Sequence, residues 1–100
     1  MTDYFVYGLS DPFTHRICYV GFSCRPEARR IQHCSSGANK ALSHWTGKLR
    51  EKAQRPELIL LEGPLNLADA KKHEFHWIEA GYHAGWPLLN VHSMPQEVSA

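Results

Sequence analysis

Residues 4–33 read YFVYGLSDPFTHRICYVGFSCRPEARRIQH, and this stretch decides the fold. Its parts 4–9 and 16–22 are rich in aromatic and β-branched residues, which favour β-strands. A polar connection containing Asp-Pro separates the two parts, so we expect a β-hairpin. Pro26 suits the first position of a helix, and the chain after it should be helical to about Ser35.

Two tyrosines and a glycine are the notable residues of the hairpin. Side chains alternate between the two faces of a strand, so pairing of the two strands should bring Tyr7 and Tyr19 within reach of each other. Gly21 lacks a side chain near the end of the second strand, which lets another group or a ligand approach the backbone closely.

The helix after the hairpin should present two different faces. Ala28 and Ile31 are apolar, and we expect them to face inward. Arg29 and His33 are four residues apart, so they project together from a neighbouring face. That face should adjoin the two strands.

A second helix and a third strand are predicted next. Apolar residues repeat at helical spacing over 41–53, and this helix should stop at Arg55-Pro56. The segment 57–62 encloses Leu-Ile-Leu-Leu and predicts a strand that is apolar on both faces. Such a strand should be central or covered.

A third helix is predicted over 67–83, followed by a short extended segment over 85–90. Asn66 and Asp69, three residues apart, resemble a capping box at the start of this helix. Its apolar stripe consists of Leu67, Ala70, Trp77, Ile78 and Gly81. Glu74 falls within that stripe, and a buried ionised carboxylate is costly unless a cation meets it. Glu74 therefore requires an explanation.

Composition limits the class of protein. The 100 residues suffice for one core but not for two. A hydrophobic share of 43% with 21% charged residues is ordinary for a globular protein, and the longest aliphatic run, 58–61, is far too short to span a bilayer. The first residues lack a basic segment followed by an apolar one, so no secretory signal is predicted. We expect a cytoplasmic protein that does not interact with membranes.

The net charge of +1 conceals an asymmetry along the chain. Residues 1–55 contain nine Lys and Arg against four Asp and Glu, whereas residues 57–100 contain two against six. The first part therefore carries +5 and the second −4. This asymmetry would suit a polyanionic partner, although the charge alone favours the simpler explanation, a solvated helix face.

Cysteine and histidine spacing argues against a zinc site. Cys18, Cys24 and Cys34 are an odd number without a C-x-x-C pair, which disfavours both a disulfide framework and a thiolate zinc site. His73 and His76 are three residues apart, whereas the zinc-protease helix needs its histidines four apart.

The remaining polar residues form a set with a definite chemical use. Hydrolysis of a phosphodiester needs a base for the attacking water, a divalent cation that polarises the phosphate, and fixed positive charge. A phenol can serve as the base when a nearby cation lowers its pKa. Glu74 is a suitable ligand for Mg²⁺, which takes only one or two carboxylates and keeps several waters.

Phe5-Val6-Tyr7 and Tyr19-Val20-Gly21 resemble the two halves of the GIY-YIG nuclease signature, with eleven residues between the tyrosines. The further matches are Arg29 at the catalytic arginine, His33 at the helix histidine, Glu74 at the metal-binding glutamate and Asn90 at the closing asparagine. The first tripeptide departs from Gly-Ile-Tyr but keeps the tyrosine. Arg30 departs as well, because an aliphatic residue is commoner there.

The resemblance covers residues 4–90 and implies both a fold and a site. It implies an α+β domain over 1–90, with a three-stranded antiparallel sheet flanked by about three helices, and a short tail over 91–100. The implied roles are a general base shared by Tyr7 and Tyr19, phosphate stabilisation by Arg29, metal binding by Glu74, and positioning or bracing by His33 and Asn90. The implied metal is Mg²⁺ or Mn²⁺.

The predicted function is that of an endonuclease that hydrolyses DNA with a single metal ion. The alternative is a non-catalytic nucleic-acid-binding or partner-recruiting module on the same fold, which the modest net charge would suit. A domain of this size makes few phosphate contacts, so binding should be weak and salt-sensitive. Specificity would then come from a homodimer, a separate targeting protein or DNA shape. The choice between DNA and RNA, and between substrate structures, stays open at this level.

Overall fold

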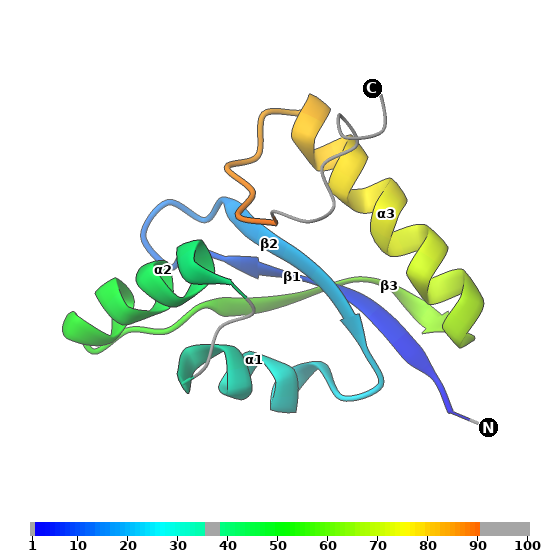
Figure 1. The fold of residues 1–100 in the computed structure, drawn as a ribbon, viewed down its shortest axis with the longest axis horizontal. Helices are drawn as coiled ribbons and strands as arrows, with labels where there is room; N and C mark the ends of the chain where they lie inside the picture. The colour runs from blue at the N-terminus through cyan, green and yellow to red at the C-terminus, as the bar shows by residue number, and fades with distance from the viewer. Residues whose placement is uncertain (1, 36–38, 91–100) are drawn as a thin grey trace.

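The computed structural model describes residues 2–35 and 39–90, which form three strands and three helices (Figure 1). In chain order these are β1 (Tyr4–Ser10), β2 (Ile17–Ser23), α1 (Pro26–Ser35), α2 (Lys40–Glu51), β3 (Glu57–Leu65) and α3 (Leu67–His83). The strands form one antiparallel sheet. This architecture confirms the predicted α+β class with a three-stranded sheet and three helices. The predicted tail, 91–100, lies outside the described residues.

The strand order is β2-β1-β3, so β1 is the central strand. Tyr7 lies opposite Gly21 in one direction and opposite Leu60 in the other. The prediction that the third strand is central or covered is wrong, because β3 is an edge strand on which Leu60 is 58% exposed and Ile59 36% exposed. An apolar run alone does not distinguish a central strand from an edge strand, and an edge position tolerates the proline of β3.

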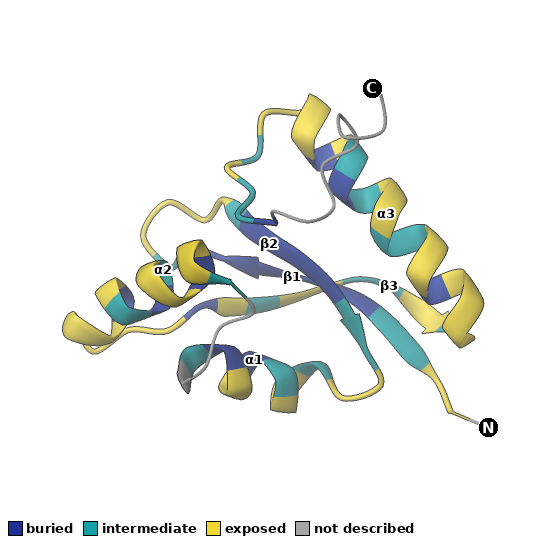
Figure 2. Ribbon diagram, in the orientation of Figure 1, coloured by how far each residue is buried: buried dark blue, intermediate teal, exposed yellow. Residues whose placement is uncertain are grey.

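The two faces of the sheet pack against different helices (Figure 2). On one face, which we call the α1/α2 face, the buried residues Tyr7, Leu9 and Tyr19 form a cluster with Leu42 of α2. On the other, the α3 face, Val6 and Val20 form a cluster with Ile78 of α3. Strand alternation accounts for this division, because neighbouring residues of β1 point to opposite faces.

Helix α1 presents a different face to the protein than predicted. Ala28 is exposed and Ile31 is 58% exposed, whereas Arg30 is 9% exposed and His33 2%. The prediction that Ala28 and Ile31 face inward is therefore wrong. Two apolar residues on so short a helix gain little from burial, and contacts of the polar residues with the strands and α2 set its orientation instead.

Helix α2 ends at Glu51, four residues earlier than predicted from the proline. The Gln54 N–H donates to the Leu49 carbonyl at 2.8 Å, and the Ala53 N–H donates to the Arg50 carbonyl at 2.9 Å. Ala53 has a φ of 58°, so this is a C-terminal turn of the Schellman type. The turn ends the helix before Pro56 can influence it.

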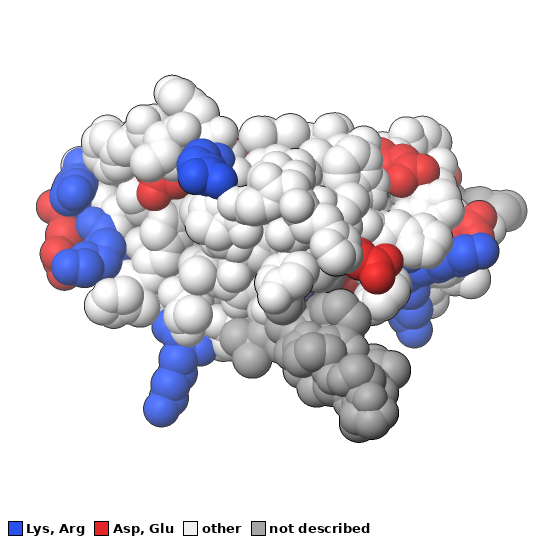
Figure 3. Space-filling view, turned by 90° about the horizontal axis from the view of Figure 1, so that it is seen from above, with Lys and Arg blue, Asp and Glu red and all other residues white. Residues whose placement is uncertain are grey.

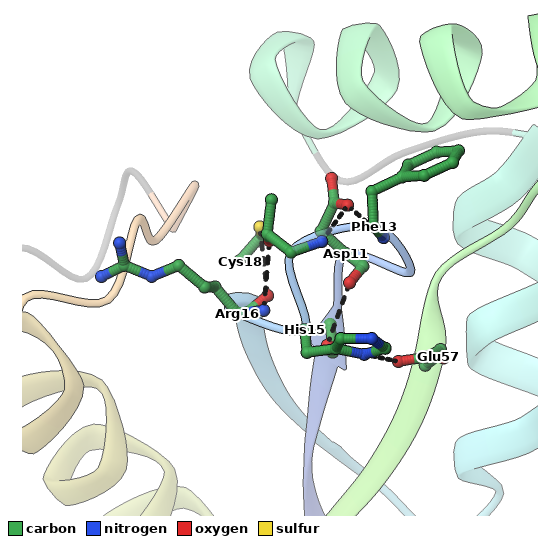
Figure 4. A network of polar contacts seen from close by, with 8 residues as sticks. Asp11, Phe13, His15, Arg16, Cys18 and Glu57 are labelled. Carbon is green, nitrogen blue, oxygen red and sulfur yellow. Dashed lines mark hydrogen bonds and ion pairs between the residues drawn. The ribbon is translucent and has the colours of Figure 1, made fainter.

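The β1–β2 turn is fastened to two other elements, and Figure 4 shows its contact with Glu57 of β3. One Asp11 carboxylate oxygen accepts the Phe13 N–H at 2.8 Å, and the other accepts the indole N–H of Trp45 on α2 at 3.0 Å. His15 contacts Glu57 of β3 at 3.3 Å. These contacts fix the hairpin and therefore the relative positions of its two tyrosines.

The segment after α3 returns to the outer edge of β2. Trp86 packs against Gly81, where any side chain would collide with the indole, and stacks on Trp77 with ring centroids 6.4 Å apart. The Leu89 N–H donates to the Cys18 carbonyl at 2.7 Å. The predicted packing of 85–90 on the sheet is thus observed, at the edge opposite β3.

On the face drawn in Figure 3, charged side chains lie toward both ends and are not gathered by sign. The face in Figure 3 carries both basic and acidic side chains at each end, with a wide uncharged band between them. On this face, the charge asymmetry of the sequence does not produce a surface of one sign. Within residues 2–35 and 39–90, no helix has the length and apolar character needed to cross a membrane.

Candidate active site

Tyr7 and Tyr19 meet above Gly21 on the α1/α2 face. A Cβ atom at position 21 would lie 2.7 Å from the Tyr7 hydroxyl oxygen and 3.2 Å from the Tyr19 ring. The phenol of Tyr7 therefore occupies the space that any larger residue at position 21 would need. Tyr7 is 1% exposed and Tyr19 is 5% exposed. The close approach expected at Gly21 is thus made by a side chain of the protein itself.

His33 of α1 packs against both phenols. Its Nε2 atom lies 3.1 Å from the Tyr7 hydroxyl oxygen, within hydrogen-bond distance, and its ring meets the Tyr19 ring edge-on at 5.1 Å. Burial, assisted by the charge of Arg29, lowers the pKa of His33 to about 4. The imidazole is therefore neutral near pH 7 and can donate or accept at Nε2, depending on its tautomer.

His33 also contains a buried polar atom that forms no hydrogen bond with the described residues. Its Nδ1 is the buried side-chain polar atom without a hydrogen-bond partner among residues 2–35 and 39–90. An unpaired buried polar atom costs roughly 1–3 kcal/mol. A leucine or methionine would avoid that cost, so the imidazole is not explained by packing alone.

Arg29 supplies the positive charge of the site. Its charge acts on Tyr7, Tyr19 and His33. It contributes to the lowered pKa of His33 and offsets part of the rise in the pKa of both phenols. Its Nη1 donates to the Gln32 side-chain oxygen at 2.7 Å. Gln32 thus orients the arginine, a role that sequence reasoning missed although the three-residue spacing on a helix indicates such a contact.

Both phenols are held in the neutral form. Burial and then the charge of Tyr19 raise the pKa of Tyr7, and burial together with the charge of Glu74 raises the pKa of Tyr19. Arg29 opposes these effects without overcoming them. Deprotonation of either phenol near neutral pH therefore requires a further positive charge at the site.

Glu74 reaches the same site from α3. Its charge acts on both tyrosines, although α3 packs on the opposite face of the sheet. Burial raises the pKa of this carboxyl group from 4.5 to about 7. Among the described residues, no side chain forms a hydrogen bond or an ion pair with it. No lysine or arginine of the described residues therefore forms an ion pair that would offset the cost of burying the Glu74 carboxylate.

The donor set around Glu74 fits a lightly held divalent cation. Three or more His, Cys, Asp or Glu side chains do not gather at one point within residues 2–35 and 39–90. Mg²⁺ and Mn²⁺ prefer oxygen ligands, and Mg²⁺ keeps several waters and is usually held by one or two carboxylates together with phosphates of the substrate. Glu74 would be the ligand.

Asn90 lies beside the site rather than in it. Its side-chain oxygen accepts the Val20 N–H at 3.0 Å, and its side-chain nitrogen donates to the Val20 carbonyl at 2.7 Å. The amide thus pairs with β2 as another strand would. Val20 lies between Tyr19 and Gly21, so Asn90 braces the backbone that carries the second motif.

The structure thus groups Tyr7, Tyr19, Arg29 and His33 on the α1/α2 face. The charge of Glu74 acts on both tyrosines from α3, and Asn90 braces β2. The residues come from β1, β2 and α1, and Glu74 comes from α3. Comparisons of the chain with protein-family models, with curated proteins and with solved structures gave no match.

Proposed function

We propose that this protein is a metal-dependent endonuclease that hydrolyses DNA phosphodiester bonds with one Mg²⁺ or Mn²⁺ ion. The observation that carries the proposal is a pair of buried phenols in contact with a buried imidazole, with the charges of a guanidinium and of a desolvated carboxylate acting on both phenols. Buried polar groups that are costly for stability and share one point are typical of functional sites.

The residues have distinct tasks in this reaction. A divalent cation held by Glu74 would polarise the scissile phosphate and lower the pKa of its neighbours. Tyr7 and Tyr19 would align the attacking water and take its proton as its oxygen bonds to phosphorus. His33 would position the Tyr7 hydroxyl, and Arg29 would stabilise the charge that builds on the phosphate as the bond to the leaving oxygen breaks.

The proposal also includes how the protein binds DNA, what supplies its specificity and in which compartment it acts. Binding to DNA should be weak and salt-sensitive, because the site itself supplies one arginine for the phosphates. A second copy of the chain or a separate targeting protein would then supply specificity. Cys18, Cys24 and Cys34 are free cysteines, as a reducing compartment such as the cytoplasm would require.

A second candidate function is binding of nucleic acid without cleavage. The raised pKa of Tyr7 and of Tyr19 favours it, because two neutral phenols can hydrogen-bond a phosphate but cannot serve as bases without added positive charge. The same fold and surface would serve this role.

Cleavage of supercoiled plasmid separates the two candidates. Wild type should nick DNA with Mg²⁺ or Mn²⁺ and not with EDTA, and Glu74→Gln and Tyr19→Phe should lose this activity. Glu79→Gln, which removes the same charge elsewhere on α3, should keep it. Metal-dependent nicking that survives in Glu74→Gln would refute the proposal. Retention of DNA without cleavage by wild type in either metal would favour the binding module.

A further inference from the structure

A cavity of about 220 Å³ lies between α1 and α2. The described residues that matter for its chemistry are Arg30, Ile31 and Cys34 from α1, Thr46 and Arg50 from α2, and Arg55 from the segment before β3. Tyr7, Tyr19, Arg29 and Glu74 do not line it. Arg29 and Arg30 are neighbours on α1, and a helix turns by about 100° per residue, so their side chains point in different directions. Arg30 lines the cavity, whereas Arg29 acts on the tyrosines.

The charged residues that line the cavity are all basic. Three arginines line it, and no acidic residue does. The nearest acidic partner is Glu27, whose Oε1 accepts from Arg30 Nη2 at 2.6 Å and from Arg30 Nε at 3.1 Å. In the described part of the chain, neither Arg50 nor Arg55 forms an ion pair. Two positive charges are therefore left unbalanced around one small cavity.

Arg30 is the least expected member of this cavity. Its side chain is 11% exposed, whereas that of its partner Glu27 is 65% exposed. Burial of a guanidinium is costly unless its partners offset the loss of water, and one largely exposed carboxylate offsets little. An aliphatic residue would pack against α2 without this cost.

Arg50 is held in place by the backbone of α1. Its Nη1 donates to the Cys34 carbonyl at 2.5 Å, near the C-terminal end of that helix. This contact fixes one end of the guanidinium and connects the two helices. A planar guanidinium with fixed orientation is suited to an anion with several oxygens, because it can offer parallel N–H donors.

We propose that this cavity binds a phosphate group, with the guanidinium groups of Arg30, Arg50 and Arg55 as its donors. Phosphate is favoured over a carboxylate because three separate guanidinium groups match an anion with several oxygens and more than one charge. The volume corresponds to roughly seven water molecules at about 30 Å³ each, which is below the range for drug-sized ligands. The exposed side chain of Ile31 offers an apolar wall to whatever carries the phosphate.

Two kinds of molecule could carry the phosphate that binds in the cavity. The phosphate belongs either to a free mononucleotide or to the backbone of a nucleic acid strand. In the second case the inference rests on the proposed function, because the cavity would then hold a phosphate of the substrate outside the reacting one. The site itself is independent of Glu74 and the tyrosines.

Direct binding to the whole protein tests the proposal. Inorganic phosphate, a mononucleotide and a short single-stranded oligonucleotide are titrated separately in EDTA, so that no cleavage occurs, with binding followed by NMR. The Kd for the bound species should rise about tenfold or more in Arg55→Gln and in Arg30→Met, since a charge-assisted hydrogen bond is lost in each. Lys48→Gln, an equal loss of charge on α2 outside the cavity, should leave it unchanged.

The outcomes separate the sources and the two proposals. Arginine-dependent binding of the mononucleotide supports a free nucleotide, and arginine-dependent binding of the oligonucleotide alone supports a strand. Glu74→Gln should retain full phosphate affinity even though its cleavage is lost, so the cavity can be confirmed while the nuclease fails, or the reverse. If none of the three probes at millimolar concentration binds in a way that depends on Arg55 or Arg30, the proposal is overturned. Arg55 is exposed and its replacement should leave folding intact, so misfolding of Arg30→Met does not obscure the result.

Discussion

On the α3 face of the sheet, Val6, Val20 and Ile78 are fully buried and carry no polar side-chain atom, whereas on the α1/α2 face the same two strands bury Tyr7 and Tyr19. The first face is an ordinary hydrophobic core. The second holds hydroxyl and imidazole groups, one of them unsatisfied. Since apolar side chains would serve stability better there, the difference indicates that the α1/α2 face is shaped by function and the α3 face by folding.

The largest effect should follow from removing one hydroxyl on the α1/α2 face. Tyr7→Phe keeps the ring and its packing but removes the hydrogen bond to His33 and one of the two phenols that share the base role in the proposed reaction. We expect the rate of DNA cleavage to fall by about 10²–10⁴-fold. Plasmid cleavage measures this, and thermal unfolding should show a loss of roughly 1–3 kcal/mol because His33 Nε2 loses its partner. A large loss of stability with full residual activity per folded molecule would remove the distinction between the faces.

Shortening a buried apolar side chain on the α3 face should lower stability strongly and leave DNA cleavage nearly unchanged. Ile78 is 0% exposed, so Ile78→Ala should lower the free energy of unfolding by about 2–5 kcal/mol through lost burial and a residual cavity. Urea unfolding measures the change. Cleavage by the fraction that remains folded should stay close to that of wild type, and a specific loss of activity would show that this face also contributes to catalysis.

Glu74 and His33 should give the free energy of unfolding opposite pH dependences. The pKa of Glu74 is raised from 4.5 to about 7, so the folded protein holds the extra proton in that range and stability falls as pH rises. The pKa of His33 is lowered from 6.5 to about 4, so the unfolded chain holds the extra proton and stability rises with pH. Each effect amounts to at most roughly 3 kcal/mol, so the two nearly cancel where the ranges overlap.

Urea unfolding in EDTA, between pH 4.5 and 6.5, checks this cancellation. Wild type should be nearly flat, Glu74→Gln should become more stable as pH rises, and His33→Gln should become less stable. Parallel curves for all three proteins would contradict the assignment of both shifts to burial in this site.

The smallest effect is expected at Leu60, which lies opposite Tyr7 on β3 but is 58% exposed. It shares the α1/α2 face without being covered by either helix. Leu60→Thr keeps a branched side chain suited to a strand, so the free energy of unfolding should change by no more than about 0.5 kcal/mol. Urea unfolding would show a larger loss if the edge were covered in solution.

Local signals predicted much of this fold. The α3 helix begins and ends as predicted, because its Asn66 cap accepts the Asp69 N–H at 2.7 Å and such a motif acts within one turn. The hairpin is confirmed for the same reason, since turn chemistry and strand alternation are short-range. The apolar stripe of α3 marks Glu74 as a misplaced carboxylate, and burial raises the pKa of that group to about 7.

The errors concern features that depend on contacts between distant segments. The orientation of α1 is set by His33 against Tyr7 and by Arg30 against α2, and neither contact is visible in the periodicity of so short a helix. The edge position of β3 depends on which strand pairs with β1 on each side. The unsatisfied nitrogen of His33 is a property of the packed interior, and no pattern of residue types encodes it.

The tryptophans divide between the two faces, and this gives the molecule two separate optical reporters. Trp77 and Trp86 stack on the α3 face with 16° between their ring planes, whereas Trp45 on α2 donates its indole N–H to Asp11. Stacked indoles couple their electronic transitions, which produces paired bands in circular dichroism. A single hydrogen-bonded indole reports through its fluorescence when Trp77 and Trp86 are replaced by phenylalanine. Loosening of the site by ligand, metal or pH can therefore be followed by the fluorescence of that variant, and the packing of the opposite face by the circular dichroism of the wild type.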